Sequence, residues 1–322
     1  MHLLIPYAAA PGPRCQSALD TLTLPHLEQL LQRVQVQVTY NGSSTDLSPL
    51  HEKATARAQG LRAGDGLLPW AAQDAHRLGL TALHGLDGWA WITPCHWSVH
   101  ADHVAMSDPL QLALTTKDYE ILRHAMQPYF SEDGITLFAH DLGHHPVRWL
   151  AHGAVFRDLP TAGLDRVSGF TVDPWMPRQN QAHSLRKLQN EMQMLLYTHP
   201  LNDTRASYKL PGINSFWVSG TGTLDTQGKS ALAAPAGPLQ VNDSLRQPAL
   251  RDDPGAWAMA WHALDNTVLS NTMKALADGQ EVCITLVGER HAVKLAQPPA
   301  KLWQRLRLRL AAPSPAELLK TL

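Results

Sequence analysis

The sequence predicts an α/β fold with a mixed, mostly parallel sheet flanked by helices. Short apolar runs typical of strands alternate with segments of helical period along the chain, which is the pattern of α/β proteins. The first run, Leu3-Leu-Ile-Pro6, is apolar enough for a central strand. Near the other end, residues 281–287 and 291–295 surround Gly288-Glu-Arg290 as the two arms of a hairpin would. A hairpin requires an antiparallel pair, so the sheet is expected to be mixed.

The individual elements follow from local residue patterns. Residues 34–40 alternate Val with polar residues and end at Asn41-Gly42, which predicts a half-buried strand and a turn. Residues 181–197 place Leu185, Leu188 and Met192 on one face of a helix. Further strands are predicted at 88–93, 103–106, 135–139 and 214–219, and further helices at 25–33, 48–58, 69–78, 116–127, within 253–277, at 299–310 and, on the surface, within 311–322.

Composition excludes several classes of protein. The 322 residues are 44% hydrophobic and 17% charged, and 27 Lys and Arg nearly balance 28 Asp and Glu. We therefore expect neither nucleic acid nor an anionic membrane as the main partner. No apolar run approaches the roughly 18 residues of a membrane helix. The three cysteines, Cys15, Cys95 and Cys283, are far apart and form no CxxC pair. We therefore expect neither a disulfide framework nor a structural zinc site, and we expect the protein to be in a reducing cytoplasm.

One polar segment has the composition of an anion-binding loop. It runs from His199 to Gly222, past the end of a predicted helix and into a predicted strand that closes in Gly-x-Gly. Arg and Lys supply positive charge, amides and imidazoles supply directional hydrogen bonds, and glycines let backbone N–H groups approach an anion. The alternative is a polar loop whose Asn and His side chains hydrogen-bond to its own backbone. The candidate binding residues in this segment are His199, Asn202, Arg205, Lys209, Asn214, Trp217, Gly220 and Gly222.

This segment resembles a motif of the archaeal-type cofactor-independent phosphoglycerate mutases, in which His-Pro-x-Asn is followed by an Arg, a Pro and an Asn before a strand closing in glycines. Upstream, Val147-Arg-Trp-Leu, Gly163-Leu-Asp-Arg-Val-Ser168 and Asp173-Pro174 resemble the same enzymes, so that residues 85–222 form a mutase-like recognition region. The whole chain is similar to the RpfE-type proteins, a bacterial group known as regulators or predicted mutases. That similarity rests on Thr93-Pro-Cys-His96 with Asp102 and Asp108 after it, the His199–Gly222 segment and Gly288-Glu-Arg290. The resemblance adds His96 and Arg148 to the candidate binding residues and implies a degenerate alkaline-phosphatase-like fold.

The departures from the mutase pattern concern catalysis. The family needs an Asp-Gly pair after the first strand, a Ser nucleophile, and Asp and His ligands in the C-terminal part, which together hold two metal ions. Here Pro6-Tyr-Ala-Ala-Ala follows the first strand, and residues 223–322 contain no Asp-x-x-x-His. The resemblance therefore implies recognition of a phosphorylated small molecule without the family's catalytic residues, metal or cofactor.

Three other patterns are weaker. His140-Asp-Leu-Gly-His144-His145, together with His96, His100 and His103, contains metal-ligand residue types, but the spacings match no metal signature. Gly222 to Ser230 approaches a P-loop but has five residues between its glycines instead of four. Lys301 to Arg309 is a basic amphipathic stretch that a solvated helix face explains.

Three functions remain open on the sequence. The first is a regulatory protein that binds a small phosphorylated ligand without turnover. The second is a phosphoglycerate mutase or phosphatase-like enzyme that uses another site, drawn from His96, Asp108, His140 and His144. The third is an interaction protein without a small ligand, which binds a protein partner. Residues 1–322 are expected to form a single α/β unit or two interleaved subdomains.

Overall fold

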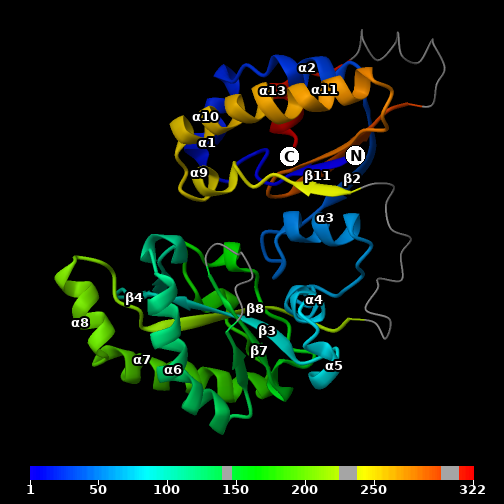
Figure 1. Cartoon of the computed structure of the whole chain (residues 1–322). Helices are drawn as coiled ribbons and strands as arrows, with labels where there is room; N and C mark the ends of the chain where they lie inside the picture. Colours follow the sequence, from blue (N-terminus) through cyan, green and yellow to red (C-terminus); the bar gives the residue numbers. More distant parts are fainter. Residues whose placement is uncertain (140–146, 225–237, 299–311) are drawn as a thin grey trace. The chain divides into compact units, whose positions relative to one another are not determined.

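The computed structural model describes residues 1–139, 147–224, 238–298 and 312–322 and divides the chain into two compact units (Figure 1). Unit 1 comprises Met1–Thr45, Pro49–Gly60 and Leu232–Leu322. Unit 2 comprises Asp46–Ser48 and Leu61–Ala231. Each unit has its own sheet and its own hydrophobic core.

Unit 1 is built on a five-stranded sheet with the order β2-β11-β10-β1-β9. Strand β1 is parallel to β9 and β10, whereas β11 is antiparallel to both β10 and β2. The predicted hairpin is therefore confirmed, as β10 and β11. The elements are β1 (His2–Ile5), α1 (Pro13–Ala18), α2 (Pro25–Leu31), β2 (Gln35–Asn41), α3 (Leu50–Ala58), β9 (Leu239–Val241), α9 (Arg246–Leu250), α10 (Pro254–Leu264), α11 (Ser270–Ala277), β10 (Cys283–Val287), β11 (His291–Ala296) and α13 (Pro315–Lys320).

Strand β1 is buried on both faces because its side chains alternate between two cores. Leu3 and Ile5 join the cluster formed with α1, α2, α10, α11 and α13, which cover one face of the sheet in Figure 1. Leu4 packs instead with Leu50 and Ala54 of α3. The C-terminal helix α13 also belongs to the first core, since its Leu319 is fully buried. The helix was predicted, but the prediction that it lies on the surface was wrong.

The turn after β1 is closed by tryptophans. Tyr7 has a left-handed backbone, with φ of 56°. The indole Nε1 of Trp257 donates to the carbonyl of Tyr7 at 3.2 Å, and that of Trp261 donates to the carbonyl of Ala8 at 3.3 Å. Both indoles are fully buried. Buried backbone carbonyls need partners, and these two come from α10.

Unit 2 contains a four-stranded sheet with the order β6-β7-β3-β8, in which every pair is antiparallel. One face packs on α6 and α7 through Ile92, Phe216 and Val218. A separate hairpin is formed by β4 and β5. The elements are α4 (Trp70–Arg77), α5 (Thr81–His84), β3 (Trp89–Cys95), β4 (Trp97–Val99), β5 (Val104–Met106), α6 (Thr116–Glu132), β6 (Thr136–Phe138), β7 (Trp149–His152), α7 (His183–Tyr197), α8 (Pro200–Ser207) and β8 (Ser215–Gly222).

The α/β class with a mixed sheet is confirmed, but the prediction of a mostly parallel sheet was wrong. Parallel pairing among the described strands is confined to the two neighbours of β1. Alternation of strands and helices indicates how the strands are connected but does not set which strands become neighbours. Here β6, which follows α6, pairs antiparallel with β7, and β8, which follows α7, pairs antiparallel with β3. None of the described helices combines the length and apolar character needed to cross a bilayer.

Candidate functional site

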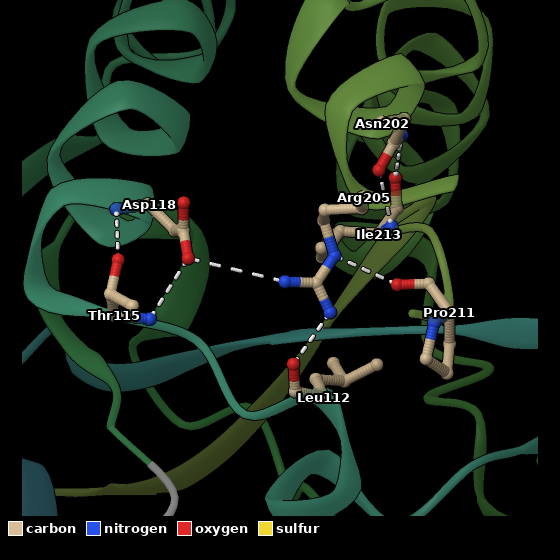
Figure 2. A network of polar contacts seen from close by, with 7 residues as sticks. All are labelled: Leu112, Thr115, Asp118, Asn202, Arg205, Pro211 and Ile213. Carbon is tan, nitrogen blue, oxygen red and sulfur yellow. Dashed lines mark hydrogen bonds and ion pairs between the residues drawn. The ribbon is translucent and has the colours of Figure 1, made fainter. Parts of the chain in front are cut away.

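Arg205 lies inside unit 2 and is bound by the protein itself (Figure 2). Its side chain is only 3% exposed. Nε donates to the carbonyl of Pro211 at 2.8 Å and Nη2 donates to the carbonyl of Leu112 at 2.5 Å, while Nη1 lies 4.0 Å from Oδ2 of Asp118. Burial lowers the pKa of Arg205 and the Asp118 carboxylate opposes that change. The guanidinium thus ties α8 to the start of α6.

The two amide side chains of the segment also bind backbone. Asn202 donates through Nδ2 to the carbonyls of Leu196 and Ile213, both at 2.7 Å, and accepts through Oδ1 from the Ile213 N–H at 2.8 Å. Asn214 accepts from the Trp97 N–H at 2.7 Å and donates to the Trp97 carbonyl at 2.8 Å. Amides used in this way fix the local chain path, which is the role that the polar-loop alternative gives them.

The two basic residues at the ends of α8 have different surroundings. His199 caps the helix, because its Nδ1 accepts from the Leu201 N–H at 3.2 Å. Lys209 is exposed and has a left-handed backbone with φ of 57°. The expectation of a loop was wrong for residues 200–207, which form α8. Arg205, Asn202 and His199 are therefore held on or beside a helix, and Lys209 follows it.

His96 marks the end of β3. Its Nδ1 lies 2.7 Å from the Gly212 carbonyl. Since a carbonyl only accepts, Nδ1 carries the proton and Nε2 keeps its lone pair when the ring is neutral. The backbone carbonyl of His96 accepts from the Ser107 N–H at 2.9 Å, which brings Asp108 into the same neighbourhood. Asp108 uses Oδ1 to cap the short helix that follows it, accepting from the Leu110 N–H at 3.0 Å.

The face of β3 and β8 that points away from α6 and α7 unites the remaining predicted residues. Strand pairing places Trp91 opposite Ser219, Thr93 opposite Trp217 and Cys95 opposite Ser215. These residues alternate with the apolar ones that pack on the helices, so all six lie on one face. The Trp217 indole donates from this face to the Ala162 carbonyl at 3.0 Å.

Arg148 is fixed on the same face by an aromatic ring. Its Cζ lies 3.4 Å from the centre of the Trp91 ring, which is cation–π contact. The Trp91 indole is itself held, because Nε1 donates to Asp74 Oδ2 at 3.0 Å. Asp74 also binds Arg77 at 2.9 Å. A stacked guanidinium keeps its N–H donors in its own plane, where they can bind oxygen atoms.

Gly220 provides close approach beside Trp91. Strand β8 has one more residue than β3 between the pairs Trp91–Ser219 and Trp89–Gly222, which makes a β-bulge. Gly220 lies in this bulge with φ of 70°, and a Cβ there would be 2.6 Å from Cε3 of Trp91. The bulge therefore requires glycine both for its backbone angle and for space.

Three hydroxyl groups on this face were not predicted from the sequence. Oγ1 of Thr93 and Oγ of Ser215 and Ser219 are buried, and none has a hydrogen-bond partner within the described part of the chain. Because Thr93 faces Trp217, the two serines are its diagonal neighbours, about 7–8 Å away. A buried hydroxyl without a partner costs about 1–3 kcal/mol, so this arrangement calls for a polar partner. The only signal in the sequence is that Ser215, Ser219 and Thr221 stand at alternate positions of 215–221, with Trp217 among them.

The other predicted site residues are not brought to this face. His100 and His103 stack at 4.5 Å in the β4–β5 hairpin, and the hydrogen bond from His103 lowers the pKa of Asp102. Within the ranges described, no group of three or more His, Cys, Asp or Glu side chains is arranged to hold a metal ion. The patterns at His140 to His145 and Lys301 to Arg309, and most of the P-loop-like stretch, lie outside the described residues.

Comparisons with known proteins find a distant similarity to solved structures. No family model and no curated protein matches the chain. Solved structures similar to it include the PH0037 protein from Pyrococcus horikoshii, at 12% identity and a TM-score of 0.44, covering 92% of this chain and 87% of that one. A second is the cofactor-independent phosphoglycerate mutase from Thermoplasma acidophilum, at 12% identity and a TM-score of 0.40, covering 100% of this chain and 98% of that one. These values place a mutase among the structural neighbours and assign no site or activity, and nothing in them supports membership of the RpfE-type group.

Proposed function

We propose that unit 2 binds a small anionic ligand, of the phosphorylated-metabolite class, in a regulatory role without turnover. The observation that carries the proposal is the Arg148 guanidinium at 3.4 Å from the Trp91 ring, on the sheet face that holds the buried hydroxyls of Thr93, Ser215 and Ser219. A cation and hydroxyl donors on one face of a sheet are suited to phosphate or carboxylate oxygens. A cost of about 1–3 kcal/mol for each unpaired hydroxyl favours a bound polar group.

The site of this proposal differs from the one expected on the sequence. Arg205, Asn202 and Asn214 bind backbone groups and stabilise the segment around α8. Arg148, Trp217 and Gly220 are the predicted residues that share a face with the hydroxyls, and Arg148 supplies the charge. The metal-independent binding that we propose needs no carboxylate or histidine ligands.

The first test is thermal unfolding of the full chain with inorganic phosphate, 2-phosphoglycerate and 3-phosphoglycerate, each with and without manganese or zinc. We expect stabilisation by at least one of these anions without added metal, since a ligand at a hundred times its Kd adds about 2.7 kcal/mol. The same stabilisation should be lost in Arg148→Gln and kept in Arg178→Gln, in which an exposed arginine of the same unit is changed.

Thr93→Val is a second variant, which removes a buried hydroxyl at nearly constant volume and keeps the charge of Arg148 intact. We expect it to weaken anion binding while the ligand-free protein still unfolds cooperatively. An anion that stabilises Arg148→Gln and Thr93→Val as well as it does the unmodified chain would overturn the proposed site. Interconversion of the phosphoglycerates, followed by phosphorus NMR, would overturn the proposal of binding without turnover.

A further inference from the structure

A second polar cluster of unit 2 lies at the other end of its sheet and plays no part in the proposed anion site. His84 ends α5 and His152 ends β7, and their ring centres are 5.2 Å apart with planes tilted by 50°. Both rings are partly exposed. Trp89 and Phe138 pack beside them, with ring centres 4.9 Å from His152 and 5.2 Å from His84 respectively. The pair is thus held by secondary structure and aromatic neighbours while solvent can reach it.

We propose that His84 and His152 form a two-histidine site for a divalent transition-metal ion such as Zn²⁺. Two imidazoles on one tetrahedral zinc have ring centres about 5 Å apart, because each Zn–N bond is about 2.0–2.1 Å long. The observed 5.2 Å between the ring centres matches this separation. Imidazole nitrogen prefers zinc, copper and nickel to magnesium or calcium, which prefer oxygen ligands.

The ring nitrogens of the pair are suitable ligands. The backbone of His84 acts on the His152 side chain to raise its pKa, against the larger effect of burial, which lowers it. Metal-binding histidines commonly donate their second ring N–H to a carbonyl, which leaves the other nitrogen for the metal. No hydrogen bond to a ring nitrogen of His84 is found among the described residues.

Burial and the neighbouring charged side chains both affect the pKa of His152. Burial lowers the pKa of His152 and the neighbouring His84 lowers it further, while Asp87 raises it and Arg157 lowers it. Asp87 itself binds Arg157, with Oδ2 at 2.5 Å from Nε. Since no third His, Cys, Asp or Glu side chain of the described residues completes a site, water would fill the remaining positions of the metal.

Isothermal titration of the full chain with Zn²⁺ at pH 7.5 tests the proposal, with Mg²⁺ as the control ion. The chain has 17 histidines, so the informative quantity is the difference between variants. We expect His84→Gln and His152→Gln each to lose one binding site, and the double variant to lose no more than either single one, because both rings bind the same ion. His183→Gln, which changes an exposed histidine at the start of α7, should keep the full number of sites.

The fold of the variants completes the test. Circular dichroism confirms that each variant is folded before titration. Equal numbers of zinc sites in the unmodified chain, His84→Gln and His152→Gln would overturn the proposal. Additive loss of two sites in the double variant would also do so, since it would mean that the rings bind separate ions.

Discussion

Asn202 and Ile213 are hydrogen-bonded in both directions: the amide of Asn202 donates to the carbonyl of Ile213, and its oxygen accepts from the Ile213 N–H. Figure 2 shows this pair beside Arg205. The contact joins the first turn of α8 to the residues that lead into β8. It replaces the backbone pairing that a regular turn would have supplied to Ile213.

Removal of the Asn202 amide should therefore destabilise unit 2. We expect Asn202→Ala to lower the free energy of unfolding by about 1–3 kcal/mol, because it leaves buried backbone groups unpaired. Urea unfolding followed by circular dichroism measures the change. Asn190→Ala on the exposed face of α7 is the matched control and should change stability by less than about 0.5 kcal/mol. Similar losses for the two variants would contradict the structural role of Asn202.

Arg205 should likewise affect stability and not anion binding. Arg205→Lys keeps the positive charge but cannot reproduce the two hydrogen bonds to the carbonyls of Pro211 and Leu112. We expect it to lower the free energy of unfolding by about 1.5–3 kcal/mol for each charged hydrogen bond lost, while the folded variant keeps the anion affinity of the unmodified chain. Urea unfolding and anion titration, made on the same preparation, separate these effects. Loss of anion affinity in a fully folded Arg205→Lys would return the binding site to the α8 segment.

A substitution at Gly222 would test the close approach of β8 to the backbone of Leu67. The φ of Gly222 is 140°, and a Cβ would lie 2.2 Å from the carbonyl oxygen of Leu67, a backbone atom that cannot swing away. We expect Gly222→Ala to prevent folding or to lower stability by more than about 3 kcal/mol. Gly134→Ala is the control, since Gly134 also has a positive φ but nothing within 4 Å, and it should cost only about 1–2 kcal/mol. Thermal unfolding compares them, and equal costs would show that the contact with Leu67 is unimportant.

His2 should make unit 1 sensitive to acid. Burial, with the positive charge of Lys294, lowers the pKa of His2 to about 4, and the ring is hydrogen-bonded to Thr285. In the unfolded chain the pKa is about 6.5. Between these values the unfolded state binds the proton and the folded state does not, so stability is full above about pH 6.5 and falls as the pH drops toward 4. The loss attributable to His2 is at most about 3 kcal/mol.

Urea unfolding at pH 7.5 and pH 4.5 measures this dependence for the chain and for His2→Gln. Other groups titrate in both proteins, so the difference between their pH dependences isolates the histidine. A smaller loss of stability in His2→Gln is the expected result. Parallel pH dependences would mean that His2 is not buried in the neutral form.

Local pattern predicted the elements better than their pairing. The hairpin of β10 and β11 could be predicted because two apolar runs lie on either side of Gly288. The structure adds a reason for this glycine, since a Cβ added at Gly288 would lie 2.6 Å from the carbonyl carbon of Leu322. Helix α8 was not predicted, because Asn202, Asp203 and Thr204 give it no apolar period and tertiary hydrogen bonds of Arg205 and Asn202 hold it. Such contacts leave no trace in local sequence.

The candidate site shows the same division. In the sequence, the family resemblance singled out Arg148 and the composition of the polar segment singled out Gly220. The structure adds Trp91, which lies against both. Arg148 directly precedes β7 and Trp91 lies in β3, far apart in sequence, so their contact depends on the pairing of β3 with β7, which the sequence does not specify. Arg205 was predicted to bind a ligand but binds backbone carbonyls instead. In a sequence, a structural arginine cannot be distinguished from a ligand-binding arginine, because the difference is in their hydrogen-bond partners.

The discontinuity of unit 1 has a consequence for synthesis of the chain. Strand β1 pairs with β9 (Leu239–Val241) and β10 (Cys283–Val287). It is synthesised before either partner, so it stays unpaired until they have been made. Nearly all of unit 2, Leu61–Ala231, is made in between and can fold while β1 is still unpaired. During that interval an apolar strand without neighbours is open to other chains and to chaperones. The order in which a ribosome releases these segments thus makes unit 1 the part of the protein most dependent on assistance.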